Sequence, residues 1–204
     1  TPTGEVTFEA NGIPLPGGTV SLDAAGQAVY TIDATNRLAV GNYPITVVYD
    51  PMGGAFSSSS GSLAGNLVVD AANTTTVVSS SSPGNVSTYG QSVTFTAIVS
   101  ADLPGGGIPS GTVAFYIDGT FVGSDPLDAS GAGHFTTALL DATPLGSPHQ
   151  IYAVFTSDVA NYNNSPNSAT IAQVVNQATA TINVTPYNVT YDGNAHTATG
   201  TATG

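Results

Sequence analysis

The sequence predicts an all-β protein made of tandem Greek-key β-sandwiches, and three observations support this prediction. A sequence pattern recurs after about 106 residues, apolar and polar residues alternate in short stretches, and turn residues separate those stretches. No stretch has the apolar spacing of an amphipathic helix. About six to eight short strands in roughly a hundred residues are typical of a sandwich.

The repeat is visible in motifs that return at a nearly constant offset. Residues 2–8, Pro-Thr-Gly-Glu-Val-Thr-Phe, return at 109–115 as Pro-Ser-Gly-Thr-Val-Ala-Phe. Leu-Asp-Ala-Ala-Gly at 22–26 returns at 127–131 as Leu-Asp-Ala-Ser-Gly, so the offset stays between 105 and 107 residues. A fixed period over such a span indicates two copies of one module.

The repeat predicts three domains. We expect residues 1–72 to form a sandwich without its first two strands, because nothing before Pro2 matches residues 73–107 of the second copy. Residues 73–178 are expected to form a complete sandwich. Residues 179–204 are expected to hold the first strands of a third repeat.

Alternating residues and turn signals place the strands in chain order. In the complete module we expect them at residues 74–79, 93–99, 111–117, 120–122, 133–138, 149–155 and 168–176. Asp118-Gly119 supplies the tight turn of a two-residue hairpin, and Pro- and Gly-rich clusters separate other strands. Two further strands are expected at 179–184 and 189–199.

Composition excludes several classes of function. The chain carries a net charge of −12 with a single Lys or Arg residue, Arg37, so it cannot neutralise a phosphate backbone or an anionic lipid surface. We therefore expect no nucleic-acid binding and no direct binding to anionic membranes. Cysteine is absent, so each module must be stable through its core alone. Because a lone Arg37 leaves little for trypsin-like proteases to cut, we hypothesise adaptation to protease-rich or high-salt surroundings.

The motifs resemble those of known families. Pro-x-Gly-x-Val-x-Phe, then Asp/Asn-Gly, then Leu-Asp-Ala-x-Gly, resembles the bacterial Ig-like repeats of large secreted surface proteins, and this resemblance implies Ig-like sandwiches. Thr-Pro-Tyr-Asn-Val-Thr-Tyr-Asp-Gly-Asn at 185–194 is similar to the Tyr-Asp-Gly type of bacterial repeat, found in adhesin-like and filamentous proteins. The resemblance implies a stalk or fibre region, extracellular or at the cell surface, with neighbouring repeats as partners. It implies no shared catalytic residues.

Candidate chemistry in the sequence is sparse. His134, His149 and His196 lie in different strands or modules without zinc-ligand spacing, so we expect ordinary strand or surface residues and no enzyme. Calcium at the domain junctions is the better candidate for a cofactor, because Ca²⁺ takes oxygen ligands from Asp, Asn and carbonyl groups. The weak candidates for its ligands are Asp70, Asn73 and Asn176. One carboxylate for each junction is few, so solvated turn residues are the favoured interpretation.

Two alternatives to a structural stalk remain open. An adhesin module that binds glycans or proteins would need an exposed aromatic cluster, for which the candidates are Tyr116, Phe121, Tyr162 and Tyr187. An accessory domain of a secreted polysaccharide-active enzyme would need a catalytic domain elsewhere. As partners we also consider other copies of the chain, joined head to tail by strand addition into a homopolymer, or a continuing polypeptide.

Overall fold

The computed structural model describes residues 1–53, 55–142, 147–186 and 188–204. Two compact units are distinguished. The first comprises residues 1–73, 103–105 and 159–163, and the second comprises residues 74–102, 106–158 and 164–204. None of the described residues forms a helix long and apolar enough to cross a membrane.

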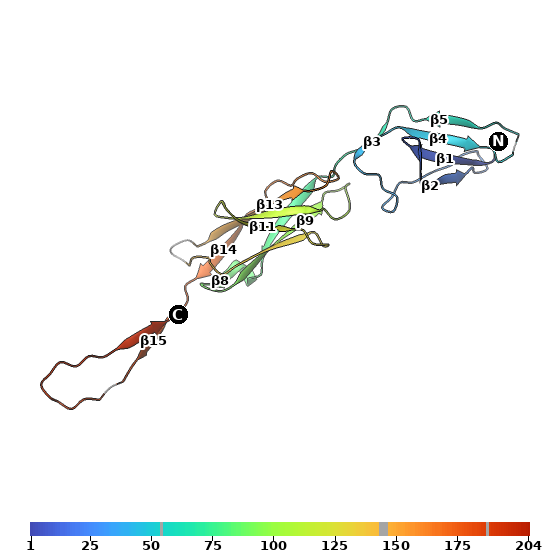
Figure 1. Cartoon of the computed structure of the whole chain (residues 1–204). Coiled ribbons are helices and arrows are strands. Elements are labelled where there is room, and N and C mark those ends of the chain that lie inside the picture. The colour runs from blue at the N-terminus through green and yellow to red at the C-terminus, as the bar shows by residue number, and fades with distance from the viewer. Residues whose placement is uncertain (54, 143–146, 187) are drawn as a thin grey trace. The chain divides into compact units, whose positions relative to one another are not determined.

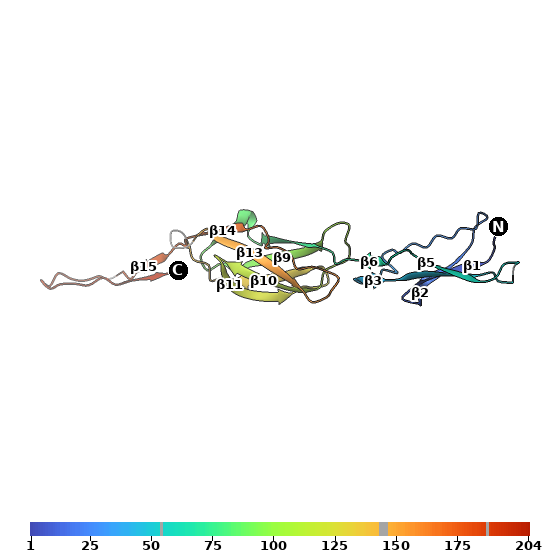
Figure 2. The same cartoon turned by 90° about the horizontal axis from the view of Figure 1, so that it is seen from above.

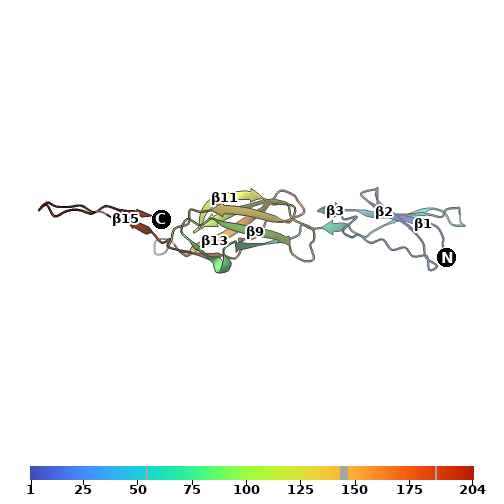
Figure 3. The same cartoon turned by 90° about the horizontal axis from the view of Figure 1, so that it is seen from below.

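The second unit contains a sandwich of two sheets (Figures 1, 2 and 3). The five-stranded sheet has the order β11 (Thr120–Pro126), β10 (Gly111–Ile117), β13 (His149–Ser157), β14 (Ile171–Asn176) and β8 (Val86–Thr88). The three-stranded sheet has the order β12 (Ala132–Thr137), β9 (Val93–Ala101) and β7 (Thr74–Ser80). A single turn of 3-10 helix, Pro83–Asn85, connects β7 to β8 across the two sheets. The predicted all-β sandwich is confirmed.

Alternation along the strands builds the core between these sheets. On β9, the four residues Val93, Phe95, Ala97 and Val99 are buried, whereas Ile98 is exposed. Phe95, Phe115 and Phe155 are fully buried, and each such side chain contributes about 1.5–3 kcal/mol. The core is therefore large enough to stabilise the module without disulfides.

In the described residues, the first unit is built from two sheets. Its main sheet has the order β2 (Ile13–Ser21), β1 (Glu5–Ala10), β4 (Ile45–Asp50) and β5 (Ser59–Ser62), seen side by side in Figure 1. β3 (Gly41–Tyr43) and β6 (Leu67–Val69) form a second, two-stranded sheet. Residues 22–40 form no strand, although the Tyr30 ring stacks on Phe8 of β1 at 5.5 Å between centroids.

The strand prediction at 189–199 is wrong. The hairpin near the end of the chain pairs β15 (Thr181–Val184) with β16 (Gly200–Thr203), and residues 188–199 lie outside both strands. Asp192 accepts a hydrogen bond from the backbone N–H of Asn194 (2.9 Å), and Gly193 adopts a positive φ of 76°. This turn interrupts the extended backbone that the alternation predicted.

The recurring motifs make the same contacts in both copies. The Leu22 N–H donates to the carbonyl of Gly4, and the Leu127 N–H donates to that of Gly111, both at 2.9 Å. Both glycines have φ above +120°, and a Cβ atom on either would collide with a carbonyl of the neighbouring strand. Pro-x-Gly and Leu-Asp-Ala-x-Gly are thus two halves of one structural junction.

The Asp of the second motif closes a loop in each copy. Asp23 Oδ1 accepts hydrogen bonds from two backbone N–H groups, those of residues 25 and 27, and Asp128 Oδ1 accepts from those of residues 130 and 132. A glycine with φ near +78° follows three residues later in both. The motif residues therefore serve the fold.

Candidate functional site

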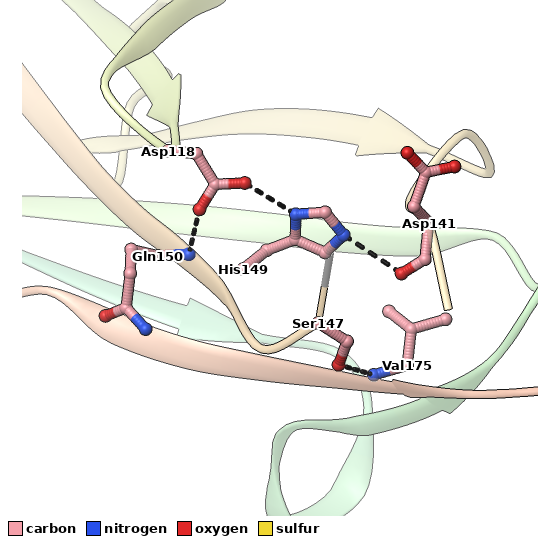
Figure 4. Close-up of polar contacts among 6 residues, drawn as sticks. All are labelled: Asp118, Asp141, Ser147, His149, Gln150 and Val175. Carbon is pink, nitrogen blue, oxygen red and sulfur yellow. Dashed lines mark hydrogen bonds and ion pairs between the residues drawn. The ribbon is translucent and has the colours of Figure 1, made fainter. Parts of the chain in front are cut away.

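The most concentrated polar cluster in the sandwich surrounds His149 at the start of β13 (Figure 4). Its imidazole is buried, with Nδ1 at 2.6 Å from Asp118 Oδ2 and Nε2 at 3.1 Å from the carbonyl oxygen of Asp141. The other carboxylate oxygen of Asp118 accepts the backbone N–H of Gln150 at 2.8 Å. The cluster therefore ties the β10–β11 turn to β13 and to the chain at Asp141.

Electrostatics keep the carboxylate of this cluster ionised. Burial acts to raise the pKa of Asp118, but the Gln150 N–H, the hydrogen bond from His149 and the charge of its ring together lower this pKa below its ordinary value. The Asp141 carbonyl and the ionised Asp118 carboxylate both accept hydrogen bonds, so a ring nitrogen that carries a proton is the donor in either contact.

The cluster has the residue types of a catalytic triad without the geometry. A triad needs the serine oxygen on the imidazole nitrogen opposite the carboxylate. Here that nitrogen, Nε2, faces the Asp141 carbonyl, while Ser147 Oγ accepts the backbone N–H of Val175 at 2.8 Å (Figure 4). In the first copy, Tyr43 stands at the position of His149, and its hydroxyl donates to the Ala39 carbonyl at 3.0 Å. Both copies thus fasten this strand to preceding backbone, which indicates a structural clamp.

The other two histidines lie in separate surroundings. His134 on β12 is exposed and has Nδ1 at 3.1 Å from Thr96 Oγ1. His196 lies four residues after Asp192, with Nε2 at 3.0 Å from its carboxylate. No group of three His, Cys, Asp or Glu side chains in the described parts of the chain is arranged to hold a metal.

The calcium candidates provide a poor donor set. The Asn73 amide oxygen, one of the proposed ligands, accepts a hydrogen bond from Nδ2 of Asn163 at 3.0 Å, both residues belonging to the first unit. Asn176 ends β14 in the second unit, and its carbonyl accepts the Tyr89 N–H at 2.8 Å. Asp70 is the one carboxylate among the three candidates, and Ca²⁺ needs about six to eight oxygens. The three candidates thus supply few of these oxygens, and calcium at the junctions stays a prediction.

Sequence reasoning did not identify Gln173, a fully buried amide on β14. Its Oε1 accepts the Ser80 hydroxyl at 2.7 Å, and its Nε2 donates to Ser87 Oγ at 3.1 Å. Ser80 ends β7 and Ser87 lies on β8, so one amide links three strands from both sheets. One feature of the sequence could have indicated it: Gln173 is a polar residue at an inward-facing strand position, where the first copy has Leu67.

Two of the four aromatic candidates come together. Tyr116 on β10 packs edge-on against Phe121 on β11, with 5.8 Å between ring centroids. Tyr152 on β13, which the sequence did not single out, stacks on Tyr116 at 4.9 Å with ring planes 2° apart. Tyr162 lies in the first unit, and Tyr187 lies outside the described residues.

One family model matches part of the chain. Residues 77–176 match the family model of the bacterial Ig-like domain, group 3. Among curated proteins none matches the chain.

Two solved structures are similar over most of its length. One is a Ca²⁺-stabilized adhesin that helps an Antarctic bacterium reach out and bind ice, with 22% identity, a TM-score of 0.38 and coverage of 90% of this chain and 43% of that one. The other is a tetra-tandem repeat in the extending region of a large adhesion protein, with 17% identity, a TM-score of 0.43 and coverage of 90% and 44%. The chain thus spans less than half the length of either.

Proposed function

We propose that this chain is a non-catalytic, tension-bearing repeat region of an extracellular bacterial surface protein. In this role each sandwich acts as a spacer that transmits force along the polypeptide. The match of residues 77–176 to a bacterial Ig-like domain supports the proposal, as do the absence of cysteine and the tandem repeat.

One structural observation carries this proposal. β8, near the start of the sandwich, lies parallel to β14, its last strand, with Val86, Ser87 and Thr88 opposite Val174, Val175 and Asn176. Pulling the chain at both ends draws β8 toward its N-terminus and β14 toward its C-terminus. Because the strands are parallel, this motion shears the hydrogen bonds between them together instead of opening them one by one.

Neighbouring contacts strengthen this parallel pair. The Tyr89 N–H donates to the Asn176 carbonyl at 2.8 Å, one residue beyond β8. Gln173 on β14 bonds the Ser87 hydroxyl of β8 and the Ser80 hydroxyl of β7, so the pair is connected to the other sheet. We infer that these contacts form the element that resists tension.

The cluster around His149 favours a structural function over catalysis. The ring nitrogen that a serine nucleophile would need faces a backbone carbonyl at 3.1 Å, and the ring is buried. A binding module is also less favoured, because Tyr116 and Tyr152 stack on each other and cover ring faces that a sugar would need. Strand addition between copies stays a prediction, for which electron microscopy of the purified protein is the check.

Force spectroscopy on the full chain, held at its two ends, tests the proposal. We expect a distinct force peak followed by an extension of at most roughly 350 Å, because the unfolded residues 74–176 span about 3.4 Å each and the length of the folded sandwich is subtracted. Gln173→Leu and Ser87→Ala should lower the peak force by weakening the β8–β14 pair.

Asp128→Ala is the matched control, since it disturbs a loop between β11 and β12 that lies outside this pair. It should leave the peak force unchanged even if it lowers stability. Gradual extension of the wild type without a peak would refute the proposal. So would a drop in force with Asp128→Ala as large as with Gln173→Leu.

A further inference from the structure

The two copies of the module differ sharply on one sheet face. On the central strands β10 and β13 of the second unit, the residues opposite the core are Thr112, Ala114, Tyr116, Gln150, Tyr152, Val154 and Thr156. None is Asp, Glu, Lys, Arg or His. Phe121 of β11 extends this face and is 55% exposed.

Three of the same positions in the first unit are acidic. Strand register aligns the copies: Glu5 pairs with Asp50 and Glu9 with Thr46, as Thr112 pairs with Thr156 and Tyr116 with Tyr152. Glu5, Glu9 and Asp50 thus occupy the places that Thr112, Tyr116 and Thr156 take in the second unit. The first sheet forms with acids at these positions, so the fold does not require the aromatic pair.

We propose that this uncharged aromatic face of the second unit is a self-association surface, on which a second copy of the chain packs sheet against sheet. The surface comprises Tyr116, Tyr152 and Phe121 with Ala114 and Val154. Interface centres are depleted of charge and enriched in Tyr and Phe, as this surface is. Two such faces pack about 10 Å apart through a two-fold axis.

Charge favours a second copy over other occupants. A basic partner would bind where the acidic residues lie, whereas two chains of net charge −12 repel each other unless they meet where neither carries charge. A sugar would need open ring faces, but the parallel Tyr116 and Tyr152 rings cover one another at 4.9 Å. Both tyrosines are half-buried on this face, and the exposed Phe121 ring beside them adds apolar area that another protein surface can cover.

Sedimentation velocity of the full chain tests this, at protein concentrations up to about 1 mM. We expect a reversible dimer that becomes tighter from about 0.1 M to about 1 M NaCl, because the Debye length shortens from about 10 Å to about 3 Å and screens the repulsion. An interface made of ion pairs would weaken instead.

Variants locate the contact. Tyr116→Glu with Tyr152→Thr, which installs the residues of the first copy, should weaken dimerisation by about tenfold or more. The neutral Tyr116→Thr with Tyr152→Thr should weaken it less. Val77→Glu adds the same charge to an exposed position on the opposite sheet and should leave the dimer intact.

Several results would overturn the proposal. One is a wild type that stays monomeric at all concentrations. Others are dimerisation lost with Val77→Glu, or a Tyr116/Tyr152 variant that stays dimeric while losing thermal stability. That last result would show that the aromatic pair only stabilises the sheet, as cross-strand pairs do. Binding of a neutral oligosaccharide by a monomeric wild type would assign the face to a different occupant.

Discussion

At the scale of single residues, the polar side chains of this protein mostly fasten backbone. Asp128 closes a loop, His149 holds a turn, and Gln173 connects three strands. Buried polar groups of this kind stabilise only while each keeps its partner, because an unsatisfied one costs about 1–3 kcal/mol. Of these three, His149 was the candidate for chemistry in the sequence, and its ring contacts a neighbouring carboxylate and a backbone carbonyl.

Acidification should weaken the fold through Asp118. Its folded-state pKa is lowered, so its contribution to stability is complete above the ordinary value near 3.9 and is lost as pH falls through the lower folded value. We expect the free energy of unfolding, measured in urea, to decline from about pH 4 downward.

Asp118→Asn provides the comparison. It removes the titrating carboxylate but keeps an oxygen that accepts the Gln150 N–H, and the first copy has Asn11 at this place. We expect it to be less stable than wild type at neutral pH and to lose less stability on acidification. Parallel loss in both proteins would contradict the assigned role of Asp118.

At the scale of elements, strand ends depend on backbone geometry that few residues allow. Gly111 begins β10 with φ of 149°, and a Cβ there would collide with the Thr156 carbonyl and the Phe155 ring. Because its own carbonyl accepts the Leu127 N–H, it cannot shift without breaking the junction between motifs.

Gly111→Ala should therefore destabilise the protein by about 3 kcal/mol or more, the sum of a strained φ and overpacking. Gly106→Ala is the control, since nothing lies within 4 Å of its Cβ position and its φ is not positive. It should change stability by less than about 0.5 kcal/mol. Equal effects in chemical denaturation would show that the strand start tolerates a side chain.

Some elements were readable from the sequence. The strand at 111–117 is confirmed as β10, because alternating Val113 and Phe115 lie between Pro-x-Gly and Asp-Gly signals. β8 was missed because its three residues show no usable alternation and pair with a strand 88 positions later. The predicted strand at 168–176 begins only at Ile171, because the Ser168 side-chain hydroxyl accepts the backbone N–H of Ala153.

Sites formed by distant residues were harder to predict. Asp118 and His149 are 31 residues apart, and only the register of β10 against β13 brings them together. The aromatic row required the same register, which is why Tyr116 and Phe121 were singled out without Tyr152. A residue-by-residue comparison of the two copies points to the aromatic pair, because the first copy has Glu9 and Thr46 at the positions of Tyr116 and Tyr152.

At the scale of the whole molecule, the two units differ in how much backbone is held in sheets. Residues 22–40 of the first unit form no strand, and Arg37 lies exposed within them, bonded through Nε to the Ala34 carbonyl at 3.2 Å. No strand pairing protects the backbone at this site.

Trypsin should therefore cut the folded protein once, after Arg37. The products should be residues 1–37 and 38–204, with the second unit intact, because the chain has one Lys or Arg in total. Mass spectrometry of a timed digest is the measurement, and Arg37→Gln should resist trypsin fully. A wild type that survives prolonged digestion would revive the hypothesis of a protease-adapted surface.

The parallel β8–β14 pair also determines when the module can be completed during synthesis. Residues 86–88 cannot pair until residues 174–176 have been synthesised. The five-stranded sheet therefore lacks this edge pairing until nearly the entire module has been translated. Pairing between such distant segments slows folding, because a long loop must close first. A growing chain of these modules would therefore remain incompletely folded at its newest repeat, while each finished repeat behind it is closed by its own last strand.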